Sequence, residues 1–178
     1  MAVCDDCELP IKGVGENNSG DTVVCCPCES LRNKDLDINL RPLNWEDLEL
    51  VLAWRSNPEI YQHFRLQDGP LNWSEHVMWY ESRDTGRHDF VIQYSNRRVG
   101  VISIDSTDEI GIYLGDFSAH GQGVATTALN WACARFRGRT PLLAEVHEEN
   151  KASRRLFERG GFEQTNKDGS WIVYTYES

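Results

Sequence analysis

The sequence contains little positive charge and almost no lysine. Lys12, Lys34, Lys151 and Lys167 are the only lysines among 178 residues, and 18 basic residues against 28 acidic ones give a formal net charge of -10 at pH 7. A protein that binds nucleic acid through its phosphates needs a basic face, because it has to neutralise those charges. The composition therefore argues against a nucleic-acid partner and favours partners that are small molecules or proteins.

Long apolar runs and a signal-peptide pattern are also missing. No stretch approaches the ~18 consecutive apolar residues that indicate a membrane-spanning helix. The amino terminus lacks a charged segment followed by an apolar one, so we expect a cytoplasmic protein with no membrane partner. At 178 residues, of which 40% are hydrophobic, the chain is long enough for one medium domain, or for one small domain with an appendage.

Most of the cysteines gather near the amino terminus. Cys4 and Cys7 form one C-x-x-C pair, and Cys25 and Cys28 form a second, which leaves Cys26 spare. Two such pairs at this spacing are typical of a zinc ribbon, in which four thiolates hold Zn²⁺ tetrahedrally. Four cysteines close the coordination sphere, so the zinc would be structural. Disulfide or redox use and a disordered segment stay open as alternatives, although a reducing cytosol disfavours disulfides.

The cysteine spacing divides the chain into two modules. A zinc-ribbon-like segment is expected at 1–30, with short strands at 11–14 and 22–24 on either side of a hairpin loop. The polar stretch 31–37 is then a linker. The remaining residues, 38–178, form a domain of the α/β (α+β) class, because predicted strands and helices are interspersed along it.

The second module has a definite order of elements, predicted from apolar periodicity, capping residues and turn residues. That order is a strand, two helices, a three-strand antiparallel meander, a glycine turn with a long helix, a strand, a helix and a closing hairpin. The predicted strands are 38–43, 89–94, 98–104, 109–114, 141–146, 162–164 and 171–176, and the predicted helices begin near Asn44, Asn72 and Val124 and span 150–159.

The glycine turn that opens the long helix is the stretch most indicative of function. Gly121 and Gly123 lack Cβ atoms, so backbone N–H groups of the first helical turn can converge on an anion such as pyrophosphate. A mononucleotide P-loop would need lysine after Gly123, where Val124 stands, and a dinucleotide fingerprint would need its third glycine at Thr126. A helix start with turn glycines and no ligand is the structural alternative. Cys133, on the apolar face of this helix, is expected in the core.

Three stretches carry a resemblance to the GNAT superfamily of N-acetyltransferases, which covers residues 38–176. The turn His120–Ala125 resembles the coenzyme A loop of that superfamily, and Asn150–Phe162 is similar to its motif N-x-x-[AS]-x-x-L-[YF]-E-[KR]-x-G-F. Trp54–Ile60, together with His76, resembles the amino-sugar-nucleotide acetyltransferases of the pseudaminic acid pathway and also ribosomal-protein acetyltransferases. The resemblance implies the GNAT fold, with a mixed, mostly antiparallel sheet and flanking helices.

The resemblance also implies acetyl-CoA as co-substrate and direct acetyl transfer to a primary amine. Backbone groups of the third meander strand would hold the pantetheine arm, and the glycine turn would hold the pyrophosphate. The implied acetyl-CoA contacts are Ile112, Tyr113, Leu114, His120, Gly121, Gln122, Gly123, Val124, Ala125, Asn150 and Phe157. Many relatives have tyrosine at position 157 to protonate the leaving thiolate, which Phe157 cannot do. Tyr113, Tyr174 or a water would serve instead, or the thiolate would leave unprotonated, as its pKa of about 8.5 permits.

Attack on the thioester requires a neutral amine. An aliphatic ammonium has a pKa near 10, so a base or a water chain has to remove its proton. We expect Glu109, at the start of the third meander strand, to be that catalytic base, with Glu145 and His147 as further candidates. The structural alternative for Glu109 is a solvated strand end.

Trp54, Arg55 and His76 are the expected acceptor contacts, with packing as the alternative. Aromatic and arginine side chains suit a nucleotide and its diphosphate, so the favoured acceptor is an amino-sugar nucleotide. A protein amino terminus, as in ribosomal-protein acetyltransferases, is the alternative acceptor, and a homodimer is left open. A rival of another class is an inactive acetyltransferase-like domain whose zinc ribbon mediates interactions. Phe157 and His120, which depart from the family pattern, favour that rival.

Overall fold

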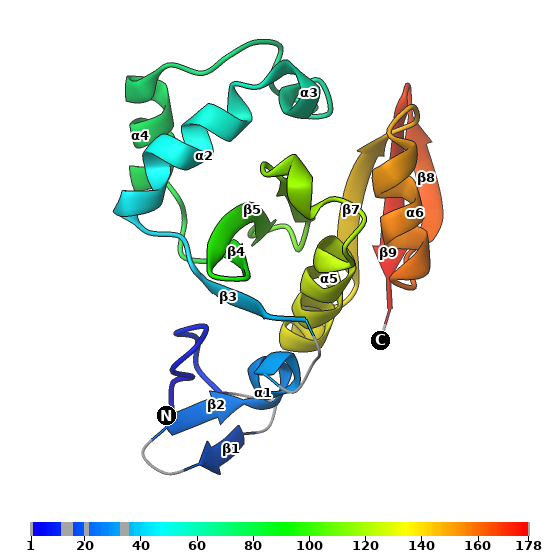
Figure 1. Cartoon of the computed structure of the whole chain (residues 1–178). Coiled ribbons are helices and arrows are strands. Elements are labelled where there is room, and N and C mark those ends of the chain that lie inside the picture. Colours follow the sequence, from blue (N-terminus) through cyan, green and yellow to red (C-terminus); the bar gives the residue numbers. More distant parts are fainter. Residues whose placement is uncertain (1, 12–15, 20–21, 33–35, 178) are drawn as a thin grey trace.

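The computed structural model of this chain describes residues 2–11, 16–19, 22–32 and 36–177 (Figure 1). The strands form a small amino-terminal hairpin, a four-stranded sheet and a three-stranded sheet. The amino-terminal segment forms one end of the molecule, at the bottom of Figure 1. Within the described ranges, every helix is too short or too polar to traverse a lipid bilayer.

The amino-terminal segment is a two-stranded hairpin followed by a helix. Strands β1 (Glu16–Ser19) and β2 (Thr22–Cys25) pair antiparallel, and α1 (Cys26–Arg32) begins directly after β2. The strand predicted at 22–24 is present as β2. The strand predicted at 11–14 falls mostly outside the described residues, and the partner of β2 is β1.

Helix α1 occupies the start of the stretch predicted as a linker. Pro27 suits the first turn of a helix, because the N–H that it lacks would have no partner there. Leu31 is only 6% exposed, and Leu36 also packs against the core. Polar neighbours obscure these two leucines in the sequence. Leu31 and Leu36, within the stretch predicted as a linker, therefore both pack against the core.

The four-stranded sheet has the order β3–β4–β5–β6, and every neighbouring pair is antiparallel. Its strands are β3 (Ile38–Pro42), β4 (His88–Tyr94), β5 (Arg97–Ile104) and β6 (Ile110–Leu114). The predicted first strand and the predicted meander are therefore present to within one residue at each end. Strand β6 lies at one edge of this sheet.

Three short helices connect β3 to β4 and lie together at the top of Figure 1. They are α2 (Leu48–Arg55), α3 (Pro58–Tyr61) and α4 (Trp73–Glu81). Asn57 and Asn72 cap the second and third by accepting hydrogen bonds from backbone N–H groups of their first turns. The helix start predicted near Asn72 is thus confirmed as a cap, and α3 is a helix beyond the two that the sequence predicted here.

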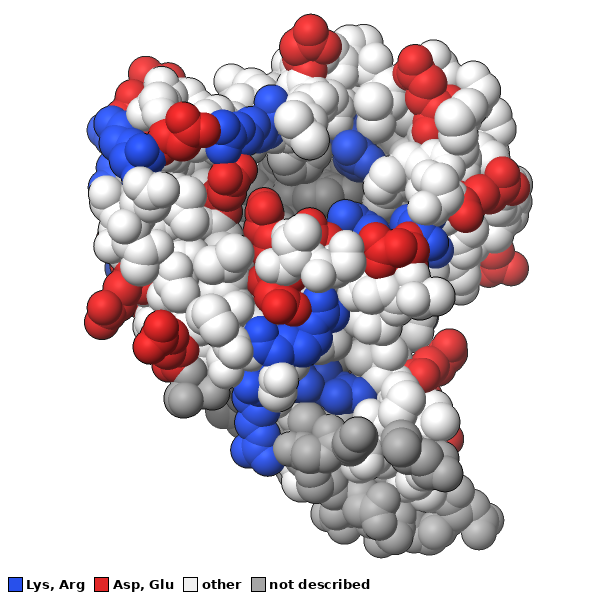
Figure 2. Space-filling model, turned by 180° about the vertical axis from the view of Figure 1, so that it is seen from behind, with Lys and Arg blue, Asp and Glu red and all other residues white. Residues whose placement is uncertain are grey.

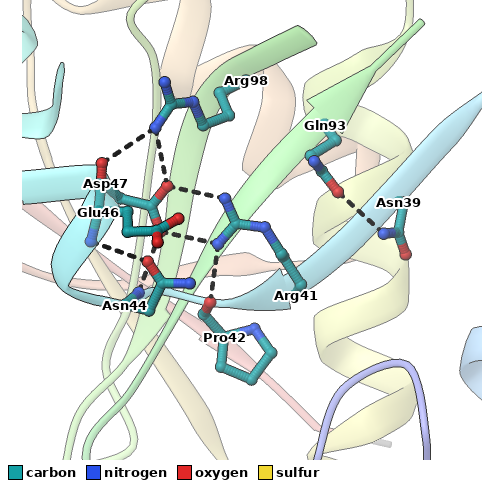
Figure 3. Close-up of polar contacts among 8 residues, drawn as sticks. All are labelled: Asn39, Arg41, Pro42, Asn44, Glu46, Asp47, Gln93 and Arg98. Atoms are coloured by element: carbon teal, nitrogen blue, oxygen red, sulfur yellow. Dashed lines mark hydrogen bonds and ion pairs between the residues drawn. The ribbon is translucent and has the colours of Figure 1, made fainter. Parts of the chain in front are cut away.

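A buried carboxylate fixes the corner between β3 and α2 (Figure 3). Asp47 is 1% exposed and accepts two hydrogen bonds of 2.7 Å from Arg41 and one of 3.2 Å from Arg98. The backbone N–H of Asn44 donates to the same carboxylate at 3.0 Å. Burial by itself would raise the pKa of Asp47, but these partners lower it. The corner therefore holds α2 in place over the sheet.

The three-stranded sheet has the order β7–β9–β8 and is also antiparallel. Its strands are β7 (Leu142–His147), β8 (Glu163–Asp168) and β9 (Trp171–Tyr176). Helix α5 (Val124–Arg135) precedes β7, and α6 (Lys151–Arg159) connects β7 to β8. All five elements match predicted ones, although β8 extends further than the predicted 162–164.

The two larger sheets meet at one point and diverge from there. Among the described residues, a single parallel bridge joins Glu109 to Leu143, and the Leu143 N–H donates to the Asp108 carbonyl at 2.9 Å. Beyond this bridge β6 and β7 belong to separate sheets. The mixed sheet that the sequence predicts is therefore split into two antiparallel sheets with one parallel contact. The split exposes backbone groups of both strands to a ligand.

Candidate active site and cysteine cluster

A cleft of about 1170 Å³ opens where β6 and β7 diverge. Its walls come from β6, the glycine turn before α5, the first turns of α6 and the segment that follows α3. Seen from behind, the molecule is hollowed in its upper half, with acidic and basic side chains around the hollow (Figure 2). A cleft of this volume has room for a nucleotide cofactor together with an acceptor.

The glycine turn has the backbone shape predicted from the sequence. Gly121 and Gly123 have φ angles of 74° and 80°, in the left-handed region that other residues rarely adopt. Gly123 is the N-cap of the 12-residue helix α5, so free N–H groups and the positive end of the helix dipole lie at the cleft. Among the described residues, no atom beyond its chain neighbours lies within 4 Å of a Cβ built on Gly121. An anion has space to approach this turn.

His120 spans from the turn to the end of β6. Its Nε2 lies 3.3 Å from the carbonyl oxygen of Leu114, and its ring contacts Phe117 edge-on with centroids 5.0 Å apart. The side chain is exposed at the cleft wall, where a phosphate can reach it. Gln122 is exposed as well, but it does not line the cleft.

Most of the implied acetyl-CoA contacts do line this cleft. They are Ile112, Tyr113, Leu114, His120, Gly121, Gly123, Val124, Ala125, Asn150 and Phe157, and the expected base Glu109 joins them. Asn150 caps α6 by accepting a hydrogen bond of 3.1 Å from the Ser153 N–H. Phe157 is 3% exposed and packs on Phe162. The fold thus gathers residues from β6, the glycine turn and α6 around one space.

Tyr113 places its hydroxyl in the interior at the cleft wall. Its ring meets Phe64 and Trp54 edge-on, with centroids 5.5 and 6.5 Å apart. Burial raises the pKa of Tyr113, and its hydroxyl has no hydrogen-bond partner among the described residues. Tyr174, the other tyrosine considered as an acid, does not line the cleft, and its hydroxyl already donates to Glu158 at 2.9 Å. Tyr113 is the better placed of the two.

Glu109 lies where β6 and β7 diverge, and its carboxyl group is a weaker acid than usual. Its side chain is half-buried in the cleft wall, next to the bridge with Leu143. Burial, and then the charges of Glu145 and Asp105, raise the pKa of Glu109 to about 7. A carboxylate in this environment exchanges a proton near neutral pH, which is the property of a general base.

Arg65 crosses the cleft and was not singled out in the sequence. It follows α3 and donates to Glu145 of β7 at 2.8 Å, and it also pairs with Asp168. Its guanidinium lies 5.9 Å from the centroid of the Trp171 ring. These partners are 80 and 103 residues away along the chain, so no local pattern could connect them. Arg65 ties the helical end of the molecule to the second sheet.

The expected acceptor contacts lie behind the cleft wall. Trp54 is 8% and His76 is 1% exposed, and neither residue lines the cleft. A Cβ on Gly115 would lie 2.1 Å from the Trp54 ring, which shows how closely that ring packs under the end of β6. Burial and the charge of Arg55 lower the pKa of His76. His76 stacks on Trp79 at 5.3 Å, and neither ring nitrogen makes a hydrogen bond among the described residues.

Arg55 is half-buried and has no carboxylate within ion-pair distance in the described part of the chain. Its guanidinium lies between the rings of Phe64 and Trp79, at 5.7 and 5.2 Å from their centroids, and donates to Gln67 at 3.3 Å. Burial lowers the pKa of Arg55. Phe64 lines the cleft, so one ring separates this charge from the space where an acceptor would lie.

The four predicted metal ligands come together at the amino terminus. The sulfur atoms of Cys4, Cys7, Cys25 and Cys28 all lie within 4.8 Å of one another, and all four residues are buried. No disulfide joins them, so the disulfide alternative is not the state of this structure. Cys26 is exposed and stands apart, whereas Cys133 is buried as predicted.

The sulfur geometry fits a tetrahedral zinc ion. Zinc–sulfur bonds of about 2.3 Å place tetrahedral sulfurs roughly 3.8 Å apart, and Cys7 and Cys25 are 3.9 Å apart. The Cys25 N–H donates to the Cys4 sulfur, and the Trp131 indole N–H donates to the Cys28 sulfur, both at 3.3 Å. Such donors support thiolate ligands. Hydrogen bonds from Cys25 and Cys28 lower the pKa of Cys7, whereas contact with Cys7 and burial raise the pKa values of Cys25 and Cys28. Four thiolates therefore need a cation between them to balance their charge.

The fold and this cleft are those expected of an acetyltransferase domain, and the family comparison agrees with them. A family model described as an acetyltransferase (GNAT) domain matches residues 37–163. The chain belongs to the GNAT acetyltransferase family. Two sequence relatives and one solved structure are similar to it.

An uncharacterized protein of Methanocaldococcus jannaschii is 36% identical over 151 residues, which are 78% of this chain and 31% of that protein. The acetyltransferase PseH of Campylobacter jejuni is 23% identical over 137 residues, 73% of this chain and 85% of PseH. A domain from Methanocaldococcus jannaschii superposes with a TM-score of 0.74 at 35% identity and covers 80% of this chain and 99% of its own. The chain thus spans about a third of the first of these relatives.

Proposed function

We propose that this protein transfers acetyl from acetyl-CoA to a primary amine, with Glu109 as the base that accepts the amine proton. The observation that carries the proposal is the setting of Glu109 at the divergence of β6 and β7, in the cleft wall, with its pKa raised to about 7. A carboxylate of this acidity is a stronger base than an ordinary one and is still largely ionised just above neutral pH.

Acetyl-CoA would lie between the two sheets. The pyrophosphate binds the N–H groups of the turn at Gly121 and Gly123, with His120 beside it. The pantetheine arm runs along the open edge of β6 toward Glu109 and bonds the backbone groups of 112–114. Asn150 and Phe157 contact it from α6. Support comes from the presence of these residues in one cleft.

In the reaction the amine nitrogen attacks the thioester carbon, so a C–N bond forms and the C–S bond breaks. Glu109 takes the proton that the ammonium loses, directly or through a water. The Tyr113 hydroxyl, which has no partner among the described residues, donates a hydrogen bond to the departing sulfur. Because burial raises the pKa of Tyr113, it keeps its proton. The nitrogen loses its second proton as the C–S bond breaks, and this proton passes through water to the coenzyme A thiolate.

For the acceptor we propose an amino-sugar nucleotide. The similarity to PseH and the resemblance of Trp54–Ile60 to amino-sugar-nucleotide acetyltransferases support it. Arg55 supports it as well, because its half-buried charge has no carboxylate within ion-pair distance among the described residues and would attract a diphosphate across the Phe64 ring that separates it from the cleft. Trp54 and His76 would then act from behind the wall, by holding Arg55 and Tyr113 in place.

A protein amino terminus is the second candidate acceptor, as in ribosomal-protein acetyltransferases. The observation in its favour is the set of acids in the cleft, where Glu59, Asp105 and Glu145 accompany Glu109. A cationic peptide would be attracted to such a wall. The pairing of Arg65 with Glu145 reduces this negative charge, and for that reason we rank the nucleotide first.

The cysteine cluster is proposed to hold one structural Zn²⁺ through Cys4, Cys7, Cys25 and Cys28. Zinc supplies the positive charge that lets four buried thiolates lie together, and in so short a segment it contributes much of the folding free energy. The domain division at 1–30, 31–37 and 38–178 remains a proposal alongside it. A homodimer is likewise left to measurement.

An acceptor panel tests the proposal. Purified protein with acetyl-CoA is offered nucleotide-linked amino sugars, peptides with free amino termini and polyamines, and free coenzyme A is measured. We expect the nucleotide-linked amino sugars to be acetylated. Acetylation of peptides alone would refute the amino-sugar acceptor and support a protein amino terminus instead. No heat of acetyl-CoA binding at millimolar ligand would favour the rival reading as an inactive interaction module. Glu109→Gln is the matched variant, because it keeps size and loses the base.

A further inference from the structure

We infer that the cysteine cluster positions helix α5, so that zinc binding and acetyl-CoA binding are thermodynamically coupled. The inference rests on the proposed function, in which zinc occupies the four thiolates and the start of α5 holds pyrophosphate. Three sets of contacts carry it.

The first contact joins a metal ligand to the middle of α5. Trp131 is 3% exposed and donates its indole N–H to the Cys28 sulfur at 3.3 Å. The ring also packs on Phe90 of β4 with centroids 4.9 Å apart. Trp131 therefore touches the cluster with one edge and the main sheet with another, and its place depends on both.

The second contact lies one turn further along the same helix face. Arg135 is 7% exposed and donates to the Pro10 carbonyl at 2.8 Å. Pro10 belongs to the loop of the first cysteine pair, where the Cys4 N–H donates to the Leu9 carbonyl at 3.0 Å. Consecutive turns of α5 thus contact both halves of the cluster, one through Cys28 and the other through the loop after Cys7.

The third set reaches the glycine turn itself. Helix α1, which carries Cys28, packs against α5 and β3 through the same buried core as the four cysteines. After α1 the chain returns with Leu36, whose Cδ1 lies 3.5 Å from a Cβ built on Gly123. Gly123 is the N-cap of α5. The amino-terminal segment therefore supports α5 along its length, from Arg135 to the residue that begins it.

Loss of metal should release this support. Without zinc the two cysteine pairs have no common partner, and α1, with seven residues, is too short to persist without its packing. Trp131 then loses its contact with Cys28, and α5 shifts as a rigid element. Converging N–H groups bind pyrophosphate well only if they are held within about 0.5 Å of the productive geometry. A small shift of the helix is enough to weaken binding.

The coupling has a definite size and must be reciprocal. Couplings between two sites are typically about 5- to 150-fold in affinity. We expect metal removal to weaken acetyl-CoA binding about tenfold, which is within that range. By linkage, saturating acetyl-CoA should raise the affinity for zinc by the same factor. A segment that stabilised only its own fold would leave both affinities unchanged.

The experiment measures acetyl-CoA binding by calorimetry on the full chain in two forms, one loaded with one equivalent of zinc and one freed of metal by a chelator under reducing conditions. The expected result is about tenfold weaker binding in the metal-free form, restored by added zinc. Hydrogen exchange of the amides in 124–135 should rise on metal removal. Far-UV dichroism checks that the metal-free protein keeps its sheets.

Two variants keep the inference open to refutation if the metal-free form unfolds. Trp131→Phe retains an aromatic ring and loses the donor to Cys28, so the zinc-loaded variant should bind acetyl-CoA several-fold more weakly with its metal still present. Cys26→Ser is the control, because it alters an exposed thiol in α1, the helix that carries Cys28. It should leave the affinities for zinc and for acetyl-CoA unchanged.

The outcomes separate the inference from the function beneath it. Equal acetyl-CoA affinity with and without metal, together with an unaffected Trp131→Phe, overturns the coupling and leaves the proposed function standing. Failure to bind about one equivalent of zinc overturns the coupling as well. Absence of acetyl-CoA binding in both forms overturns the proposed function and the coupling with it.

Discussion

Glu109 allows the sharpest test of the proposed chemistry, because its raised pKa should affect both the pH dependence of acetyl transfer and the free energy of unfolding. If it is the base, kcat/KM should rise with pH and level off above about 7, the value to which burial and the neighbouring acids raise its pKa. Glu109→Gln should lower kcat/KM by about 10²- to 10⁴-fold and remove this ascending limb. The assay follows coenzyme A release from pH 5.5 to 9 at limiting acceptor.

The same substitution should stabilise the fold. A carboxyl whose folded pKa is raised holds its proton more tightly when folded, so ionising it above pH 7 costs stability, and the cost disappears as the pH falls toward 4.5. A rise from 4.5 to about 7 corresponds to about 3 kcal/mol for a fully buried group. Glu109 is only half-buried, so we expect Glu109→Gln to raise the free energy of unfolding by about 1 to 2 kcal/mol at pH 8.

Glu145→Gln is the matched control for this argument. The charge of Glu145 is the second cause of the raised pKa of Glu109, so its removal should move the ascending limb of the pH profile to lower pH. Loss of the bridge to Arg65 should also lower kcat/KM several-fold at every pH, which is far less than the loss expected for Glu109→Gln. Denaturant unfolding at pH 5 and pH 8 measures the stability effect. A Glu109→Gln enzyme that keeps its rate and its pH dependence would refute the role of Glu109 as the base.

Three further predictions concern other parts of the molecule. Gly123→Asp should abolish acetyl-CoA binding in calorimetry, because it brings a Cβ and a negative charge to a residue at φ 80° where pyrophosphate approaches. Gly169→Asp, at a turn with φ 58° that does not line the cleft, should bind normally. Arg65→Ala breaks the salt bridge to Glu145, so in steady-state kinetics it should raise the acceptor KM at least several-fold and leave the acetyl-CoA affinity unchanged. An unchanged acceptor KM would mean that Arg65 is only a surface contact. Elemental analysis of freshly reduced protein should find about one zinc, and Cys7→Ser should lose most of it, whereas a metal-free wild type would refute the site.

Much of the fold could be predicted because its signals are local. The strands around Phe90 and Val101 are marked by apolar runs, and Asn72 and Gly123 mark the starts of α4 and α5 as caps. The glycine turn was predictable for the same reason, since its function depends on consecutive residues. Local signals do not reveal α1, because polar neighbours conceal its buried Leu31.

The rest of the site depends on contacts between distant parts of the chain. Arg65 has partners that only the folded chain brings to it, and the Cys28–Trp131 contact joins residues 103 positions apart. Trp54 and His76 show that burial, too, cannot be predicted from local sequence. Their side chains suit a ligand site, but exposure cannot be read from residue type, and the fold buries both of them.

The divergence of β6 and β7 also has a consequence for the protein in the absence of its cofactor. Two sheet edges then face each other with unpaired N–H and C=O groups, and an open edge of this kind is a template on which another extended chain can add. In the proposed binding mode, the pantetheine arm of acetyl-CoA would lie along β6 and occupy that template. Supply of the cofactor would then protect the folded chain against self-association, so aggregation on storage should slow in the presence of coenzyme A even when no acetyl group is transferred.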